Sequence, residues 1–75
     1  MESRKIKLGK YRHYKNKEKS YQVLGVARHS ETGEDLVVYK KLYDDYAMLV
    51  RPFTMFTEEV ELEGKKVLRF EYLEE

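Results

Sequence analysis

The stretch SYQVLGVARHSETGEDLVVYKKLY, residues 20–43, decides the fold of this 75-residue chain. Two runs rich in valine, leucine and tyrosine, Ser20–His29 and Leu36–Tyr43, flank the charged turn Glu31–Asp35. β-branched and aromatic residues fit a pleated, half-buried surface, and a short polar loop with glycine is typical of a chain reversal. The stretch therefore predicts two neighbouring strands and an all-β protein.

The same pattern continues outward in both directions. Further strands are predicted at Lys10–Tyr14, Met48–Phe53, Val60–Leu62 and Val67–Leu73. Pro52 lacks the N–H that a ladder needs and keeps its predecessor extended, so it ends the fourth strand. A short helical turn is expected over Thr54–Thr57, with Thr54 as its cap and with Met55 and Phe56 beneath it.

Five or six short antiparallel strands in so small a chain cannot form two large sheets. A strongly bent antiparallel sheet, or a partly open SH3-like barrel with one short helical turn, hides the strand edges best. An OB-like barrel is the second choice, because no helix is expected in the middle of the chain. Residues 1–75 are predicted to form a single domain, in which residues 1–8 are a flexible basic arm.

The last hairpin allows a finer prediction. Val60 and Leu62 alternate with glutamates, and Leu68, Phe70 and Tyr72 alternate with mostly charged residues. If both sets face one core, the loop between the strands must have an odd number of residues. We therefore expect a loop of three or five residues that includes Gly64 at a positive φ, with a bulge.

Composition excludes several classes of function. The chain has no cysteine, which rules out disulfides, thiolate nucleophiles and cysteine-ligated zinc, and suits the cytoplasm. No stretch approaches the roughly 20 apolar residues of a membrane helix, so neither secretion nor a membrane partner is expected. The total charge is +1, but residues 1–20 hold eight basic and two acidic side chains, whereas residues 55–75 hold three and seven. This asymmetry indicates either an electropositive face or strands of complementary charge.

Three arginines from different strands are candidates for an anion site. Arg12, Arg28 and Arg51 could converge, and guanidinium groups bind phosphate or carboxylate through paired hydrogen bonds. The alternative is that they pair with carboxylates of the same sheet. His13 and His29 fall short of a zinc site without a third ligand such as Glu31, and structural roles are the default for both.

Tyrosines form the second candidate feature. Tyr39 and Tyr43 are four residues apart with Lys41 between them, so alternation places all three on one face of a strand. Aromatic rings interleaved with basic side chains bind single-stranded nucleic acid by stacking, and the same surface beside Pro52 would suit an extended peptide. The alternative is that several of the seven tyrosines cover the ends of the barrel.

Three segments carry a resemblance to a known family: GKYRHY at residues 9–14, ARHSET at residues 27–32 and RPFTMF at residues 51–56. The chain resembles a family of short bacterial proteins catalogued as domain of unknown function number sixteen fifty-three, over residues 9–73. The resemblance implies a small bacterial domain but brings no catalytic or binding residues with it. The chain departs from the family pattern at Leu49, where a bulky aromatic is common, and in its lysine-rich first turn.

These observations favour a non-enzymatic binding module for single-stranded nucleic acid or a peptide, acting as a monomer or weak homodimer without metal or cofactor. A small-anion or enzymatic site of histidine and arginine at a dimer interface is the alternative, and a structural protein that dimerises through a sheet edge is the third. The predicted ligand-binding residues lie on the first four predicted strands: Arg12, Arg28, His29, Tyr39, Lys41, Tyr43 and Arg51.

Overall fold

The computed structural model describes residues 6–16 and 18–74. Its elements in chain order are β1 (Gly9–His13), β2 (Ser20–Arg28), β3 (Asp35–Lys41), β4 (Met48–Pro52), α1 (Phe53–Phe56), β5 (Glu59–Leu62), β6 (Lys65–Leu68) and β7 (Phe70–Glu74). Five strands form one antiparallel sheet in the order β4-β3-β2-β1-β7, and β5 pairs with β6. The all-β prediction is confirmed. The described residues contain seven strands where five or six were predicted.

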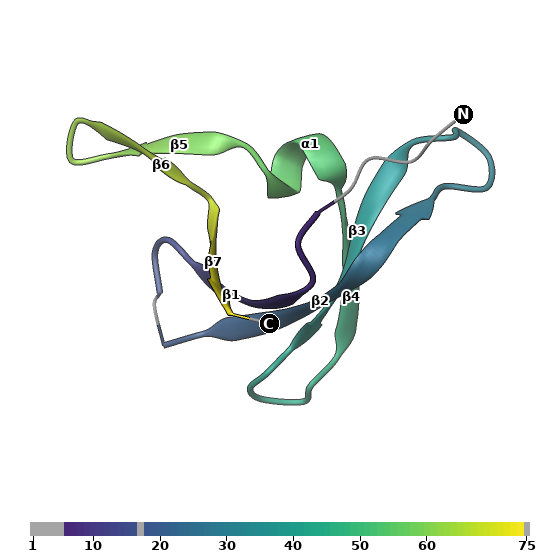
Figure 1. The fold of residues 1–75 in the computed structure, drawn as a ribbon, viewed down its shortest axis with the longest axis horizontal. Helices are drawn as coiled ribbons and strands as arrows, with labels where there is room; N and C mark the ends of the chain where they lie inside the picture. Colours follow the sequence, from purple (N-terminus) through teal and green to yellow (C-terminus); the bar gives the residue numbers. More distant parts are fainter. Residues whose placement is uncertain (1–5, 17, 75) are drawn as a thin grey trace.

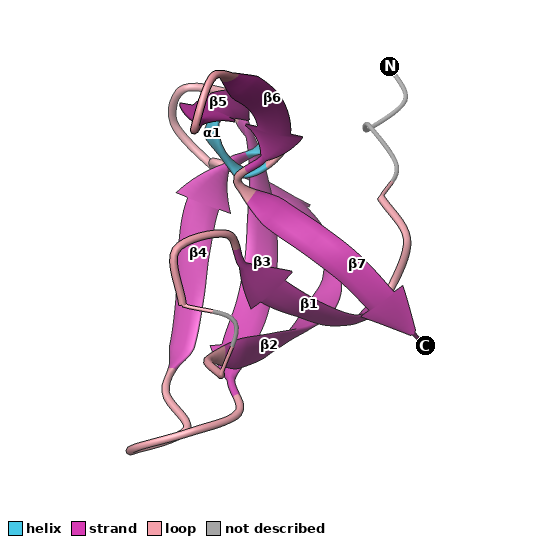
Figure 2. Cartoon of the chain, turned by 90° about the vertical axis from the view of Figure 1, so that its left-hand side faces the viewer, coloured by secondary structure: helices cyan, strands magenta, loops and turns pink. Residues whose placement is uncertain are grey.

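The five-stranded sheet is strongly bent, as predicted (Figure 1). The register of β2 against β3 shifts between Val23 and Gly25, and such bulges bend a strand and increase its twist. The bend brings the two edge strands toward each other, since the Arg51 guanidinium of β4 lies 5.5 Å from the ring centre of Phe70 in β7. β4 and β7 do not pair, so the sheet curls into a partly open structure rather than a closed barrel (Figure 2).

The core lies on the concave face of this sheet, and α1 and the β5–β6 hairpin lie on the same side (Figure 1). It is built mostly from aromatic residues at alternate strand positions: Tyr11, Tyr21, Val23, Val37, Tyr39, Phe56 and Phe70. The rings of Phe56 and Phe70 stack with centroids 4.2 Å apart, so α1 is attached to the sheet through Phe56. We call the opposite surface of the sheet the convex face.

The helical turn differs from its prediction in two respects. It begins at Phe53 with Pro52 as its N-terminal flanking residue, and no side chain caps it, so the predicted Thr54 cap is wrong. Starting one residue earlier places Thr54 inside the turn. Phe56 is buried as predicted, but Met55 on the other side of the turn is 45% exposed.

The loop of the last hairpin also differs. Leu62 pairs with Lys65, which leaves the two-residue turn Glu63-Gly64 with φ values of 51° and 78°. The positive φ of Gly64 is confirmed, but the odd-numbered loop is wrong. The prediction assumed one continuous strand after the turn, whereas the chain breaks at Arg69 and the alternation restarts at Phe70. Val60 therefore faces Val67, and Leu68 is largely exposed.

The chain is attached to the core from the first described residue, because Ile6 packs against the core cluster and the Lys7 carbonyl accepts a hydrogen bond from the Tyr11 hydroxyl at 2.8 Å. The rest of the predicted arm, residues 1–5, lies outside the described residues. Over residues 6–16 and 18–74, no helix is long and apolar enough to cross a membrane.

Candidate functional site

The structure separates the predicted ligand-binding residues into three places. Arg12 lies on the convex face opposite Ser20, where β2 begins, and Arg28 lies where β2 ends. Eight residues of strand separate these two positions by roughly 26 Å. Arg12, Arg28 and Arg51 therefore do not converge. The prediction used alternation along each strand, but convergence also depends on the register between strands, which the sequence does not give.

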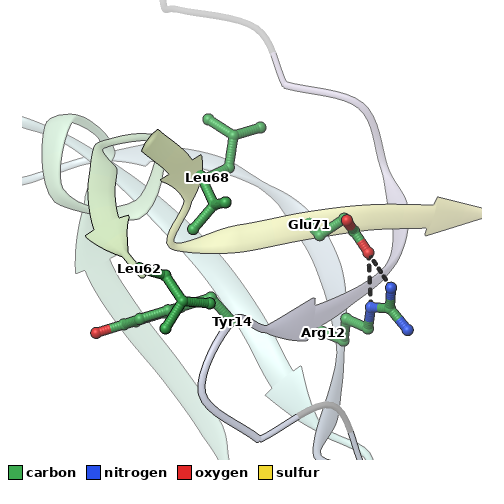
Figure 3. Close-up of a pocket in the computed structure, with 6 residues that line it drawn as sticks. Arg12, Tyr14, Leu62, Leu68 and Glu71 are labelled. Atoms are coloured by element: carbon green, nitrogen blue, oxygen red, sulfur yellow. Dashed lines mark hydrogen bonds and ion pairs between the residues drawn. The ribbon is translucent and has the colours of Figure 1, made fainter. Parts of the chain in front are cut away.

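Arg12 contributes to a different feature, a cavity of about 240 Å³ beside the β5–β6 hairpin (Figure 3). The cavity is lined mainly by apolar side chains, including Leu62, Val67 and Leu68. Arg12 donates from Nε to Glu71 at 2.6 Å and forms an ion pair with the same carboxylate. Its charge is thus neutralised, and the cavity offers an apolar surface rather than an anion site.

Arg28 and His29 lie in and next to the β2–β3 hairpin turn. Arg28 faces Asp35 across the hairpin, with 3.9 Å between Nε and Oδ1. His29 Nδ1 accepts the backbone N–H groups of Glu31 and Thr32 at 3.1 and 3.3 Å. These contacts give His29 a structural role in the turn. In the part of the chain that the structure describes, no group of histidine and carboxylate side chains could hold a metal.

The remaining predicted residues come together at the open side of the curled sheet, between β4 and β7. Tyr39 is only 3% exposed, and its hydroxyl accepts a long hydrogen bond of 3.4 Å from Arg51 Nε. Arg51 in turn lies over the ring of Phe70. Tyr39 is therefore part of the core and offers the surface little beyond its hydroxyl, whereas Arg51 covers the core and faces solvent in part.

This surface continues with Tyr43 and Lys41, and with Lys19, which was not among the predicted binding residues. The Tyr43 hydroxyl is 2.9 Å from that of Tyr21, and the Lys19 and Lys41 ammonium groups each lie 5.2 Å from the Tyr43 ring centre. Burial and the bond to Tyr43 raise the pKa of Tyr21, so the Tyr21 hydroxyl remains protonated at neutral pH. Tyr43 is thus a fixed ring with cations at its face.

His13 completes the surface and was not among the predicted binding residues. Its ring meets Phe70 edge to face at 5.2 Å and Tyr14 at 4.9 Å. Its Nδ1 accepts the Lys15 N–H at 3.2 Å, so the neutral ring carries its proton on Nε2. The missed signal was alternation, since His13 lies two residues beyond the buried Tyr11 on the same face of β1.

Electrostatics distinguish this surface from the rest of the molecule. Burial, followed by the positive charges of Arg69, Arg51, Lys15 and Lys19, lowers the pKa of His13. Among these cations Arg69 is paired with Glu58, and Lys41 nearby is paired with Asp44 and Asp45. Within the described residues Arg51 forms no ion pair. We call this surface the basic seam, defined by His13, Lys19, Lys41, Tyr43 and Arg51.

Comparison with known proteins shows to which family the chain belongs. A family model described as "Protein of unknown function (DUF1653)" matches residues 9–72. The chain belongs to this family. The crystal structure of a DUF1653 protein from Bordetella bronchiseptica has 37% sequence identity and a TM-score of 0.80, over 91% of this chain and 87% of that one. No curated protein matches the chain. The resemblance predicted from the three sequence segments is confirmed, and the DUF1653 fold is the bent sheet described above.

Proposed function

We propose that the domain is a non-enzymatic binding module that holds single-stranded nucleic acid against the basic seam. The observation that carries the proposal is Arg51, a cation beside the open edge of the sheet that has no carboxylate partner among the described residues. A guanidinium group that is left unpaired next to further cations is suited to a phosphate.

The aromatic part of the seam supports nucleic acid over a simple anion. Tyr43 and His13 are partly exposed rings next to basic side chains. Such rings stack on unpaired bases while the cations contact the backbone. The seam is also long. Its two ends are Lys41, which is opposite Ala47 just before β4, and Arg51, which lies four residues further along the chain. That is roughly 13 Å, more than one phosphate spans.

Overall charge does not oppose the proposal. The chain as a whole is nearly neutral at +1, but the acidic partners of two arginines lie away from the seam, in the ion pairs Arg12–Glu71 on the convex face and Arg28–Asp35 at the hairpin. The local excess of positive charge around His13 is what a phosphate would experience.

The test is a titration of labelled protein with mixed single-stranded DNA and RNA oligonucleotides, followed by two-dimensional amide NMR. We expect shifts at His13, Lys19, Tyr43 and Arg51, and a steep loss of affinity between about 50 and 200 mM salt because counterions are released. Arg51→Ala should weaken binding and reduce the salt slope by about one.

Arg28→Ala is the matched control, because it removes an arginine that faces Asp35 beside the β2–β3 turn, at the opposite end of β2 from His13 and Lys19, and should leave binding unchanged. The proposal fails if about 1 mM oligonucleotide moves no seam resonance, or if Arg51→Ala and Arg28→Ala bind alike. Equal affinity for inorganic phosphate and for an oligonucleotide would instead indicate a small-anion site.

A further inference from the structure

The outer edge of β4 is an open strand edge. Within the described residues β4 pairs only with β3, at the end of the sheet order. The Lys41 N–H donates to the Ala47 carbonyl at 3.0 Å, just before β4 begins. Bonding direction alternates along an antiparallel strand, so the backbone groups of Met48 and Val50 point away from β3. Pro52 has no N–H and ends the donor row.

The first three residues of this edge, Met48, Leu49 and Val50, lack the usual protection against pairing, which begins only at Arg51 and Pro52. Met48 is 63% exposed, Val50 59% and Leu49 37%, and none of them is charged. Natural edge strands are commonly guarded by charged side chains, by proline or by a covering segment. The other edge strand, β7, carries the exposed Glu71 in an ion pair with Arg12, and the Lys7 ammonium lies over its Tyr72 ring.

The exposed apolar surface extends from the edge over the convex face. Val50 lies opposite Val38, which lies opposite Gly25, and a Cβ at Gly25 would meet nothing within 4 Å. Leu24 beside it is also exposed. A contiguous apolar patch of this kind marks an interaction surface more often than a solvated one.

β4 can pair with a second copy of itself in one favourable antiparallel register. With Val50 on the two-fold axis, Val50 faces Val50 of the other copy, Met48 faces Pro52, and Leu49 faces Arg51. Val50 then exchanges two N–H to carbonyl hydrogen bonds with Val50 of the other copy, and the Met48 N–H of each copy faces the Pro52 carbonyl of the other. The only charged residue of the strand faces an apolar one, so no like charges meet across the axis.

We infer that β4 forms the interface of a two-fold symmetric homodimer, in which the two bent sheets join into one continuous sheet through their β4 strands. The interface is isologous, as expected for a closed dimer. The convex patches of the two copies adjoin, and the two seam arginines come onto the same face. The inference does not rest on the proposed function, because dimerisation is measured without any ligand.

The test is sedimentation equilibrium of the protein alone over a wide concentration range. We expect a reversible monomer–dimer equilibrium that is weak, because edge pairing buries a small area. Val50→Pro removes the two N–H donors on the axis and leaves the bonds between β3 and β4, so it should raise the dissociation constant at least about tenfold. Met55→Lys, an equally simple change of an exposed apolar residue on α1, should leave it unchanged.

A second measurement identifies the interface even if Val50→Pro does not fold. Val50→Lys should also dissociate the dimer, because it places two ammonium groups side by side on the axis. In a sample mixed from differently labelled chains, the Hα atoms of Leu49 and of Arg51 in the other copy should show a nuclear Overhauser effect, since such non-hydrogen-bonded pairs are close. A monomer at about 1 mM, or a dimer that both Val50 variants leave intact, would overturn the inference.

Discussion

The two arginine–histidine pairs of this chain have the same sequence and different environments. Arg12-His13 ends β1, and Arg28-His29 ends β2 and enters the turn. In each pair the arginine faces a carboxylate of a neighbouring strand, and the histidine Nδ1 accepts the backbone N–H two residues further on. The local chemistry of the two pairs is therefore alike.

The difference arises from the strands that lie beside each pair. His13 is opposite Phe70 of β7 and within the field of Arg51 from β4, because the bend of the sheet brings both edges together there. His29 lies beyond the last paired residues of the β2–β3 hairpin, at the opposite end of β2. The comparison teaches that a binding surface in this fold is made by the curl of the sheet, not by the dipeptide.

The largest effect is expected when the Phe70 ring, which lies beneath the basic seam, is removed. Phe70→Ala should lower the free energy of unfolding by about 3–5 kcal/mol, because Phe70 is 4% exposed and packs with Phe56, Tyr21 and Tyr39. The loss is comparable to the whole stability of a small domain. Urea unfolding followed by circular dichroism measures it.

Leu68→Ala is the control, since Leu68 is two residues away and 49% exposed. It should cost well under half as much. If the two variants unfold at the same urea concentration, the aromatic cluster does not support the seam and the contrast between the two histidines loses its basis.

A smaller effect is expected at the other histidine. His29→Ala removes the acceptor of two backbone N–H groups in the turn, and by analogy with the loss of a helix N-cap it should cost about 1 kcal/mol. His29→Asn should restore most of that stability, because an asparagine oxygen accepts the same kind of bond. Thermal unfolding of the three proteins gives the comparison.

The same variants sharpen the functional contrast. Oligonucleotide affinity should be unchanged in His29→Ala, because the turn lies away from the basic seam. A loss of affinity as large as that of Arg51→Ala, in a variant that remains folded, would place the turn in the binding surface and contradict the separation of the two ends.

The sequence was sufficient for the strands and for the bent sheet, because alternation and turn residues are local signals. It was insufficient for the register between strands, which decides that Arg12 meets Glu71 and lies eight residues of strand away from Arg28. The break at Arg69 was missed for the same reason, since no proline or glycine marks it. Of the seam, Lys41, Tyr43 and Arg51 were predicted from alternation and residue type, and alternation also places His13 on the core face of β1, whereas the approach of Arg51 to His13 and Lys19 depends on the curl.

The smallest expected effect is a change in the pKa of His13. It is also the most specific, because it reports the electrostatic surroundings in which His13 differs from His29. Burial and then the nearby cations, Arg69 and Arg51 first among them, lower its pKa. Arg51→Ala should raise that pKa toward the usual value, and Arg28→Ala should not. The chemical shift of the His13 Hε1 proton across pH reports the titration directly.

The lowered pKa of His13 also makes the free energy of unfolding depend on pH. Unfolded His13 takes up its proton near pH 6.5, whereas folded His13 does so at lower pH. Between these values the unfolded chain binds more protons, so the free energy of unfolding falls as the pH decreases below about 6.5 and is unaffected above it. The pKa of Asp45 is lowered by its hydrogen bond to Lys41, so this carboxylate changes the free energy of unfolding only below pH 3.8, its usual pKa. Arg51→Ala should narrow this pH window from its lower end, because the folded pKa of His13 rises toward 6.5, and an unchanged window would show that Arg51 does not act on His13.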